Sequence, residues 1–339
     1  MTDTSLSYIS ALTGLKELDL SACGSFTSTA LQALIRARPH LELLKVKVSA
    51  ESLDDFLRCI GSYCRYLKDL QVISDSKSTL TSPRTLAQGC PLLEDLSLFC
   101  SLTDNDDAIA ILAEFSPRLR CTDMALTATD KGLVTLSRGC PDLRRVSIFN
   151  PHVTDAAILS LAEHCHKFKS IGINCTNQHI TSRSLSALFQ SNPGLTSVSL
   201  FKGKYTVDDE AVLTLAHCCP KLISIRIFGQ PCLTESPFIA LISRCVDLTE
   251  LSISDCNIFD ALVDALAHHC QHLKTAIFDN CPNLTEHSLL TLLAHFRCLN
   301  YVSLRGCGVA VTYKEGLYSQ IRRRPVSRRL IVFIDDMVM

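Results

Sequence analysis

Residues 140–165 decide the fold: they read Cys-Pro-Asp-Leu-Arg-Arg-Val-Ser-Ile-Phe, then a short loop, then Thr-Asp-Ala-Ala-Ile-Leu-Ser-Leu-Ala-Glu-His-Cys. In the first half, Leu143, Val146 and Ile148 are the apolar positions of a short run, which predicts one strand with a buried face. The second half has apolar residues at helical spacing, namely Ile158, Leu161, Ala162 and Cys165. This pattern predicts a helix with a single apolar stripe.

The helix also has a predicted start. Thr154 offers a side-chain oxygen to the backbone N–H groups of the first turn, and the carboxylate of Asp155 complements the helix dipole there. The same pair precedes other apolar helical stripes, at Thr2-Asp3, Thr103-Asp104, Thr129-Asp130, Thr234-Glu235 and Thr285-Glu286. One strand and one helix cannot bury both apolar faces alone, so this unit requires copies of itself on either side.

The chain supplies these copies. The first apolar residue of each predicted strand recurs every 24 to 27 residues, at Leu15, Leu41, Leu67, Leu93, Leu119, Leu143, Phe168, Leu195, Leu222, Leu248, Leu273 and Leu299. A stacked array has one continuous core of any length. We therefore expect a single solenoid over residues 1–339, with an incomplete N-terminal repeat (1–14), about twelve repeats (15–321) and a C-terminal cap (322–339).

Cysteine follows the same register. Seven cysteines lie three residues before a first apolar strand position: Cys64, Cys90, Cys140, Cys165, Cys219, Cys245 and Cys270. Metal or disulfide chemistry would require clustered ligands such as paired Cys-x-x-Cys at finger spacing, and the sequence has no such cluster. We expect buried free thiols at a repeated corner, no metal site, and a reducing compartment, either cytoplasmic or nuclear.

Composition excludes several classes of function. The chain of 339 residues has a formal net charge of −1, which gives no electrostatic case for nucleic acid or an anionic membrane as a partner. No Gly-rich phosphate loop or nucleophile elbow is present, so we expect no enzyme activity and no cofactor. The densest histidine group, at residues 268, 269 and 272, is typical of a solvated helix end.

These motifs carry a family resemblance. The pattern Leu-x-x-Leu-x-Leu, then Cys or Asn, then Leu-Thr-Asp and a helix ending in Cys-Pro resembles the cysteine-containing class of leucine-rich repeats. That class is best known from F-box proteins, the substrate receptors of cullin–RING ubiquitin ligases, and the resemblance covers about residues 2–334. It implies an α/β leucine-rich-repeat solenoid (horseshoe) with a parallel β-sheet on the concave face and helices on the convex face.

The N-terminus differs from the F-box pattern, because Thr2-Asp3-Thr4-Ser5-Leu6 already reads as the helical half of a repeat. We expect either a repeat-only relative or a natural protein whose missing upstream segment docks a cullin–RING adaptor. The leading hypothesis is a protein-interaction module that recognises substrates for ubiquitin-dependent degradation. The alternative is a repeat-only scaffold or regulator with no link to a ligase.

The candidate site lies on the predicted concave face. Side chains alternate along a strand, so the residues two, four and six positions after the first apolar residue point away from the core. The sixth position is phenylalanine in four repeats, which is unexpected on a solvated face. We predict a protein-binding site at Phe99, Phe149, Phe201 and Phe228, with Arg145 and Arg226 beside them. Alternatively, these rings simply cover neighbouring strands or lie under the C-terminal tail.

Overall fold

The computed structural model describes residues 1–48, 53–78, 81–102, 105–122, 127–174, 179–201, 207–309, 330–334 and 337–338. Contacts within the chain divide it into two compact units, Met1–Lys167 and Phe168–Met339. We call them unit 1 and unit 2. The expectation of one continuous domain stays a prediction.

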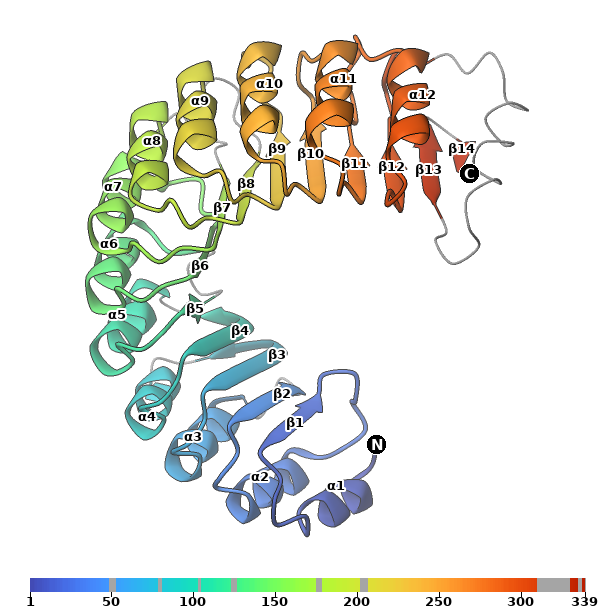
Figure 1. The fold of residues 1–339 in the computed structure, drawn as a ribbon. Helices are drawn as coiled ribbons and strands as arrows, with labels where there is room; N and C mark the ends of the chain where they lie inside the picture. Colours follow the sequence, from blue (N-terminus) through green and yellow to red (C-terminus); the bar gives the residue numbers. More distant parts are fainter. Residues whose placement is uncertain are drawn as a thin grey trace. The chain divides into compact units, whose positions relative to one another are not determined.

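Unit 1 alternates helices and strands in chain order: α1 (Asp3–Ile9), β1 (Glu17–Leu20), α2 (Ser28–Ala37), β2 (Leu43–Lys47), α3 (Leu53–Tyr63), β3 (Asp69–Ser78), α4 (Thr81–Gly89), β4 (Asp95–Leu102), α5 (Asn105–Phe115), β5 (Cys121–Thr122), α6 (Asp130–Gly139), β6 (Arg145–Ile148) and α7 (Asp155–His164). Strands β1 to β6 pair with their sequence neighbours in parallel. The helices cover one face of this sheet (Figure 1).

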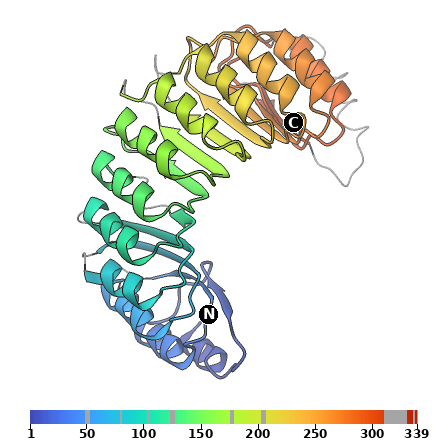
Figure 2. The same ribbon diagram turned by 60° about the vertical axis from the view of Figure 1, so that its left-hand side comes forward.

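Unit 2 continues the alternation: β7 (Ser170–Asn174), α8 (Ser182–Gln190), β8 (Ser197–Phe201), α9 (Asp209–Cys218), β9 (Ser224–Phe228), α10 (Glu235–Arg244), β10 (Glu250–Ser254), α11 (Asp260–His269), β11 (Thr275–Ile277), α12 (Glu286–His295), β12 (Tyr301–Ser303), β13 (Ile331–Ile334) and β14 (Met337–Val338). The printed registers pair β7 with β8, β8 with β9, and β9 through β13 in sequence, all parallel. Strand β14 is antiparallel to β13. Here too the helices lie on one side of the strands (Figure 2).

Burial confirms the predicted register. Leu143, Val146 and Ile148 are fully buried, while Arg145 between them is exposed. Removing the apolar surface of each fully buried side chain from water stabilises the fold by about 1.5–3 kcal/mol. Strand β5 is described over Cys121 and Thr122, and the buried Thr122 occupies a position that is apolar in its neighbours.

Neighbouring helices are tied together by a carboxylate that the sequence interpretation assigned only to the helix dipole. Asp130 accepts two hydrogen bonds from Thr154 of the next repeat, from the backbone N at 2.8 Å and from Oγ1 at 2.5 Å. In unit 2 Asp209 accepts the same two bonds from Thr234, at 2.9 and 2.6 Å. Equivalent pairs are Asp3 with Thr27, Asp106 with Thr129, and Asp260 with Thr285.

These bonds correct part of the capping prediction. Thr154 and Thr285 do accept a bond from a first-turn N–H, as expected. Thr129 and Thr234 make no such bond. Their hydroxyl hydrogens point to the carboxylate of the preceding repeat, so the threonine links two repeats as well as marking a helix start. Thr103-Asp104 lies outside the described residues.

The seven cysteines in repeat register are fully buried free thiols. Six of these sulfurs donate to backbone carbonyls of the preceding repeat, as from Cys90 Sγ to Cys64 O at 3.3 Å and from Cys140 Sγ to Ser116 O at 3.5 Å; the others are those of Cys165, Cys219, Cys245 and Cys270. Burial raises the pKa of Cys140 and of Cys165 to about 12. These carbonyls also accept a backbone bond, Cys64 O from Leu67 N and Ser116 O from Leu119 N, so the weakly donating thiol adds a second bond to a carbonyl at a tight corner.

Candidate protein-binding face

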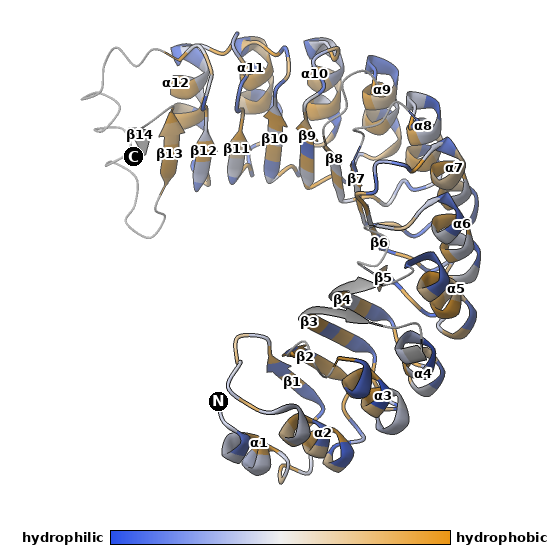
Figure 3. Ribbon diagram, turned by 180° about the vertical axis from the view of Figure 1, so that it is seen from behind, coloured by the Kyte–Doolittle hydropathy of each residue, from blue (hydrophilic) through white to orange (hydrophobic). Residues whose placement is uncertain are grey.

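The sheet face of each unit that carries no helices is named the open face here. Along several strands, buried apolar residues alternate with half-buried or exposed ones, and the hydropathy colours of the described strands alternate along the chain (Figure 3). The predicted direction of the sixth-position residues is therefore confirmed where their side chains are described. Three of the six predicted site residues lie in each unit, so the open faces are described separately.

In unit 2 the structure brings two of the predicted phenylalanines into direct contact. Phe201 ends β8 and Phe228 ends β9, and their rings stack with centroids 5.4 Å apart and an interplanar angle of 4°. Both rings are half-buried, whereas their strand neighbours Leu200 and Ile227 face the core. The parallel rings form an apolar platform of aromatic carbon at the end of two adjacent strands.

Arg226 lies on the same face and is held by an ion pair. Its Nη2 is 2.6 Å from Glu250 Oε1, and its Nε donates to the same oxygen at 2.8 Å. The other carboxylate oxygen accepts from Ser224 Oγ at 2.9 Å. Because Ser224, Arg226 and Glu250 fix one another, the guanidinium has a defined position on this face. Its predicted role in orienting a partner remains a prediction.

Serines occupy several outward positions on the other strands of this face. Ser252, Ser254 and Ser303 are buried among their neighbours. Ser252 Oγ has no hydrogen-bond partner among the described residues. Short hydroxyl side chains allow another chain to approach the sheet closely.

A second aromatic group on this face was missed by sequence reasoning. Tyr301 and Phe333 have ring centroids 5.4 Å apart, and the guanidinium of Arg305 lies 4.3 Å from the centre of the Phe333 ring. Phe333 follows Leu299, the last regularly spaced repeat, by 34 residues, so no periodic signal pointed to it. Its hydrophobic neighbours Val332 and Ile334 were the available clue, because they flank an outward position of β13.

In unit 1 the open face is charged. Phe149 follows β6 and is 40% exposed, and Arg145 is exposed at the start of that strand. Phe99 belongs to β4, but its side chain lies outside the described part of the structure. Asp69 and Asp95 face each other across β3 and β4. Burial, and then the Asp95 charge, raise the pKa of Asp69.

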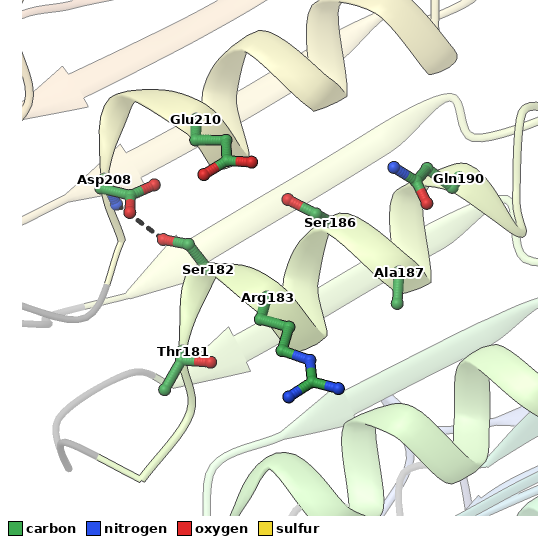
Figure 4. A pocket seen from close by; sticks show the side chains of 8 residues that line it. All are labelled: Thr181, Ser182, Arg183, Ser186, Ala187, Gln190, Asp208 and Glu210. Carbon is green, nitrogen blue, oxygen red and sulfur yellow. Dashed lines mark hydrogen bonds between the residues drawn. The ribbon is translucent and has the colours of Figure 1, made fainter.

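A hollow of about 510 Å³ lies on the helix side of unit 2, between α8 and α9 (Figure 4). Its lining is polar and mixed in charge: Thr181, Ser182, Arg183, Ser186, Ala187, Gln190, Asp208 and Glu210. Ser182 Oγ accepts from the backbone N of Asp208 at 2.9 Å, a bond that links the starts of the two helices. This arrangement offers neither an apolar wall nor a single sign of charge, and it does not favour a particular ligand.

Within the described ranges, no three histidine, cysteine or acidic side chains converge as metal ligands. The described helices are also too short and too polar to cross a membrane. His268, His269 and His272 are exposed around the end of α11, as the sequence predicted.

Known proteins of two kinds resemble this chain. It is 24% identical over 353 aligned residues to "GRR1-like protein 1" of Arabidopsis thaliana, covering 89% of this chain and 60% of that protein. It is 29% identical over 151 residues to "Coronatine-insensitive protein homolog 2" of Oryza sativa subsp. indica, covering 41% of this chain and 26% of that protein. The chain therefore spans less than two thirds of the length of these relatives. No family model matches it.

A solved structure has the same architecture. A chain in the crystal structure of the Rad7 and Elc1 complex in yeast superposes with a TM-score of 0.62 at 15% identity, covering 98% of this chain and 83% of that one. At this identity the match establishes the fold. The chain has the leucine-rich-repeat solenoid fold. It resembles the repeat region of F-box/leucine-rich-repeat proteins.

Proposed function

We propose that this leucine-rich-repeat protein recognises substrates for ubiquitin-dependent degradation and that the open face of unit 2 makes the contact. One observation carries the proposal: the stacked rings of Phe201 and Phe228 lie on a sheet face that no helix covers. Aromatic side chains contribute a disproportionate share of the binding energy at protein interfaces. On this face the parallel rings offer an apolar contact, and the fixed Arg226–Glu250 pair offers a directional polar one.

The ligase connection rests on sequence similarity to the plant relatives. In this proposal, a segment of the natural protein outside these 339 residues docks a cullin–RING adaptor. Buried free thiols fit a reducing compartment, so we place this activity in the cytoplasm or nucleus. A scaffold or regulator that binds partners on the same face without a ligase is the alternative outcome of the test.

The test uses tagged natural protein expressed in cells treated with a proteasome inhibitor, with co-purified proteins quantified by mass spectrometry. We expect a cullin–RING adaptor and at least one further protein whose half-life lengthens when the natural protein is depleted. Phe201→Ala combined with Phe228→Ala should lose the further protein and retain the adaptor. Recovery of partners without any adaptor would favour the scaffold alternative.

Two control variants separate binding from folding. Phe259→Ala removes a ring that is 46% exposed just before α11, away from the platform, and should retain every partner. Phe189→Ala removes a fully buried ring and should lower the free energy of unfolding by about 3–5 kcal/mol, so this variant should melt at a lower temperature. A platform variant that melts normally and still binds all partners would contradict the proposed contact site.

A further inference from the structure

The open face of unit 1 has an ordered arrangement of charge that the proposed contact of unit 2 does not use. Asp69 on β3, Asp95 on β4, Cys121 on β5 and Arg145 on β6 occupy the same register position on successive parallel strands. Within unit 1 this row runs from Glu17 on β1 and Leu43 on β2 through the adjacent carboxylates of Asp69 and Asp95 to Cys121 and the Arg145 guanidinium. All four side chains from Asp69 to Arg145 are half-buried or exposed on this face.

The two carboxylates are held together without a neutralising partner. Like charges directly opposite on adjacent strands destabilise a sheet. Asp95 Oδ1 is buried and has no hydrogen-bond partner among the described residues. Burial and the Asp95 charge raise the pKa of Asp69 despite the opposing charges of Lys45 on β2 and of Arg145, and neither cation forms an ion pair with Asp69 or Asp95 within the described contacts. The two carboxylates therefore have cations in their surroundings but none in direct contact within the described residues.

Arginine is in excess at the Arg145 end of the row. Arg120 pairs with Glu94, and Lys167 pairs with Asp142 at 2.5 Å. Arg145 and its chain neighbour Arg144 form no ion pair with a carboxylate in the described part of unit 1, although their charges act on Asp69 and Asp142 respectively, and both side chains are exposed. The backbone N atoms of both residues donate to Arg120 O, so the two start β6 at a fixed place.

We propose that the open face of unit 1 binds an extended protein segment that places a lysine or arginine over Asp69 and Asp95 and an aspartate or glutamate against Arg145. Complementary charges across an interface select a partner and set its register. Asp95 and Arg145 are two strand steps apart, which is about 10 Å. A segment in the extended polyproline II conformation rises about 3.1 Å per residue and returns its side chains to the same face at every third residue, so three residues cover about that distance. The segment therefore carries its basic and acidic side chains three positions apart.

This inference rests on the proposed function only in that the chain must bind protein segments. The probe is a phage-displayed library of random 12-residue peptides, selected on the purified whole chain. We expect enriched peptides with one basic and one acidic residue three positions apart. A synthetic copy of an enriched peptide should bind more weakly as ionic strength rises, because salt screens these contacts.

Charge exchange gives the decisive comparison. Asp95→Lys should weaken binding of the synthetic peptide at least ten-fold, and so should Arg145→Glu. A peptide with its basic and acidic residues exchanged should bind the Asp95→Lys/Arg145→Glu double variant and not the natural chain. Asp95→Asn, which keeps the side-chain shape, serves as a milder variant, and thermal melts show that each variant is folded.

The outcomes separate the two proposals. Enriched peptides that lack the charge spacing, or that respond to Phe201→Ala and Phe228→Ala but change less than two-fold with Asp95→Lys, overturn this inference and leave the proposed function standing. Peptides insensitive to substitutions on both open faces, or no enriched peptide at all, overturn both. Exchange of specificity by the double variant supports the inference alone.

Discussion

Units 1 and 2 are built from the same repeat but present different chemistry on their open faces. Unit 1 places Asp69, Asp95 and Arg145 in one row, with an exposed phenylalanine after β6. Unit 2 places stacked aromatic rings, an internally neutralised Arg226–Glu250 pair and a floor of serines. The difference shows that the outward positions of a repeat can vary freely because they take no part in the shared core.

Edge charges follow the same division. In unit 1 the position after the first apolar strand residue alternates in sign over the first five repeats, from Lys16 to Arg120. Glu42 forms ion pairs with Lys16 at 2.8 Å and with Lys68 at 2.6 Å. Hydrogen bonds from the two lysines hold the pKa of Glu42 at about 2. In unit 2 this position is occupied by Thr196, Ile223 and Thr249, among others. The charged character of unit 1 thus extends from its open face to the start of its strands.

The largest expected effect concerns what the units share, their core. Val146→Asp in unit 1 and Ile225→Asp in unit 2 each place an unpaired charge at a fully buried strand position, which should cost at least ~3 kcal/mol and unfold adjacent repeats. Circular dichroism melts measure the loss, and hydrogen exchange locates it. Ser147→Asp, an outward neighbour, should stay within about 0.5 kcal/mol. Equal melts for all three variants would contradict the repeat assignment.

The next effect tests whether the carboxylate–threonine links matter equally in both units. Asp130→Ala and Asp209→Ala each remove both bonds to the following threonine, and we expect a loss of ~1–2 kcal/mol from each. Asp→Asn at the same positions keeps one acceptor oxygen and should cost less. Urea denaturation with an unchanged slope checks these values. If neither substitution lowers the free energy of unfolding, the links do not stabilise the fold, and these carboxylates interact favourably with the helix dipole only.

A smaller effect should appear only in unit 1. Asp69→Asn removes a like-charge contact and should raise stability near pH 7 by about 0.2–1 kcal/mol, toward the lower value because solvent screens the charge. The folded-state pKa of Asp69 is raised, so the natural chain loses stability as pH rises through that pKa. The advantage of the variant should therefore vanish below the ordinary aspartate pKa of 3.8. Paired unfolding curves from pH 3 to pH 7 measure this difference.

The smallest difference is expected at the cysteines. The seven buried thiols occur in both units, and at pKa values of about 12, or about 11 for Cys245, the thiolate fraction at pH 8 is about 10⁻⁴ to 10⁻³. Native maleimide labelling should spare all seven and modify the exposed Cys232, whereas labelling after denaturation should modify nearly all 18 cysteines. Rapid native labelling confined to one unit would show that its repeats open more readily.

The fold could be predicted from the sequence because the core residues recur at the same positions from one repeat to the next. A period near 26 residues and alternation within each strand were enough to place Val146 inside and Phe149 outside, and the structure agrees. The last strand was also predictable, from Leu330 and Val332, although it follows a long gap. The cysteine register predicted buried thiols, because a small apolar side chain at one repeated position has one environment.

Only the tertiary structure decided which outward residues meet. Phe201 contacts Phe228, Asp130 bonds to Thr154, and Asp69 faces Asp95, in each case across 24 to 27 residues of chain. A pattern within one repeat shows the direction of a side chain but not its partner, because the partner lies one repeat away and depends on strand register and rotamer. For the same reason the sequence grouped Arg226 with a binding role, while the structure pairs it with Glu250. The sequence alone determines which strand positions are apolar and buried, since their periodic recurrence is enough to predict burial. The contacts on the open faces form only once neighbouring strands are in register.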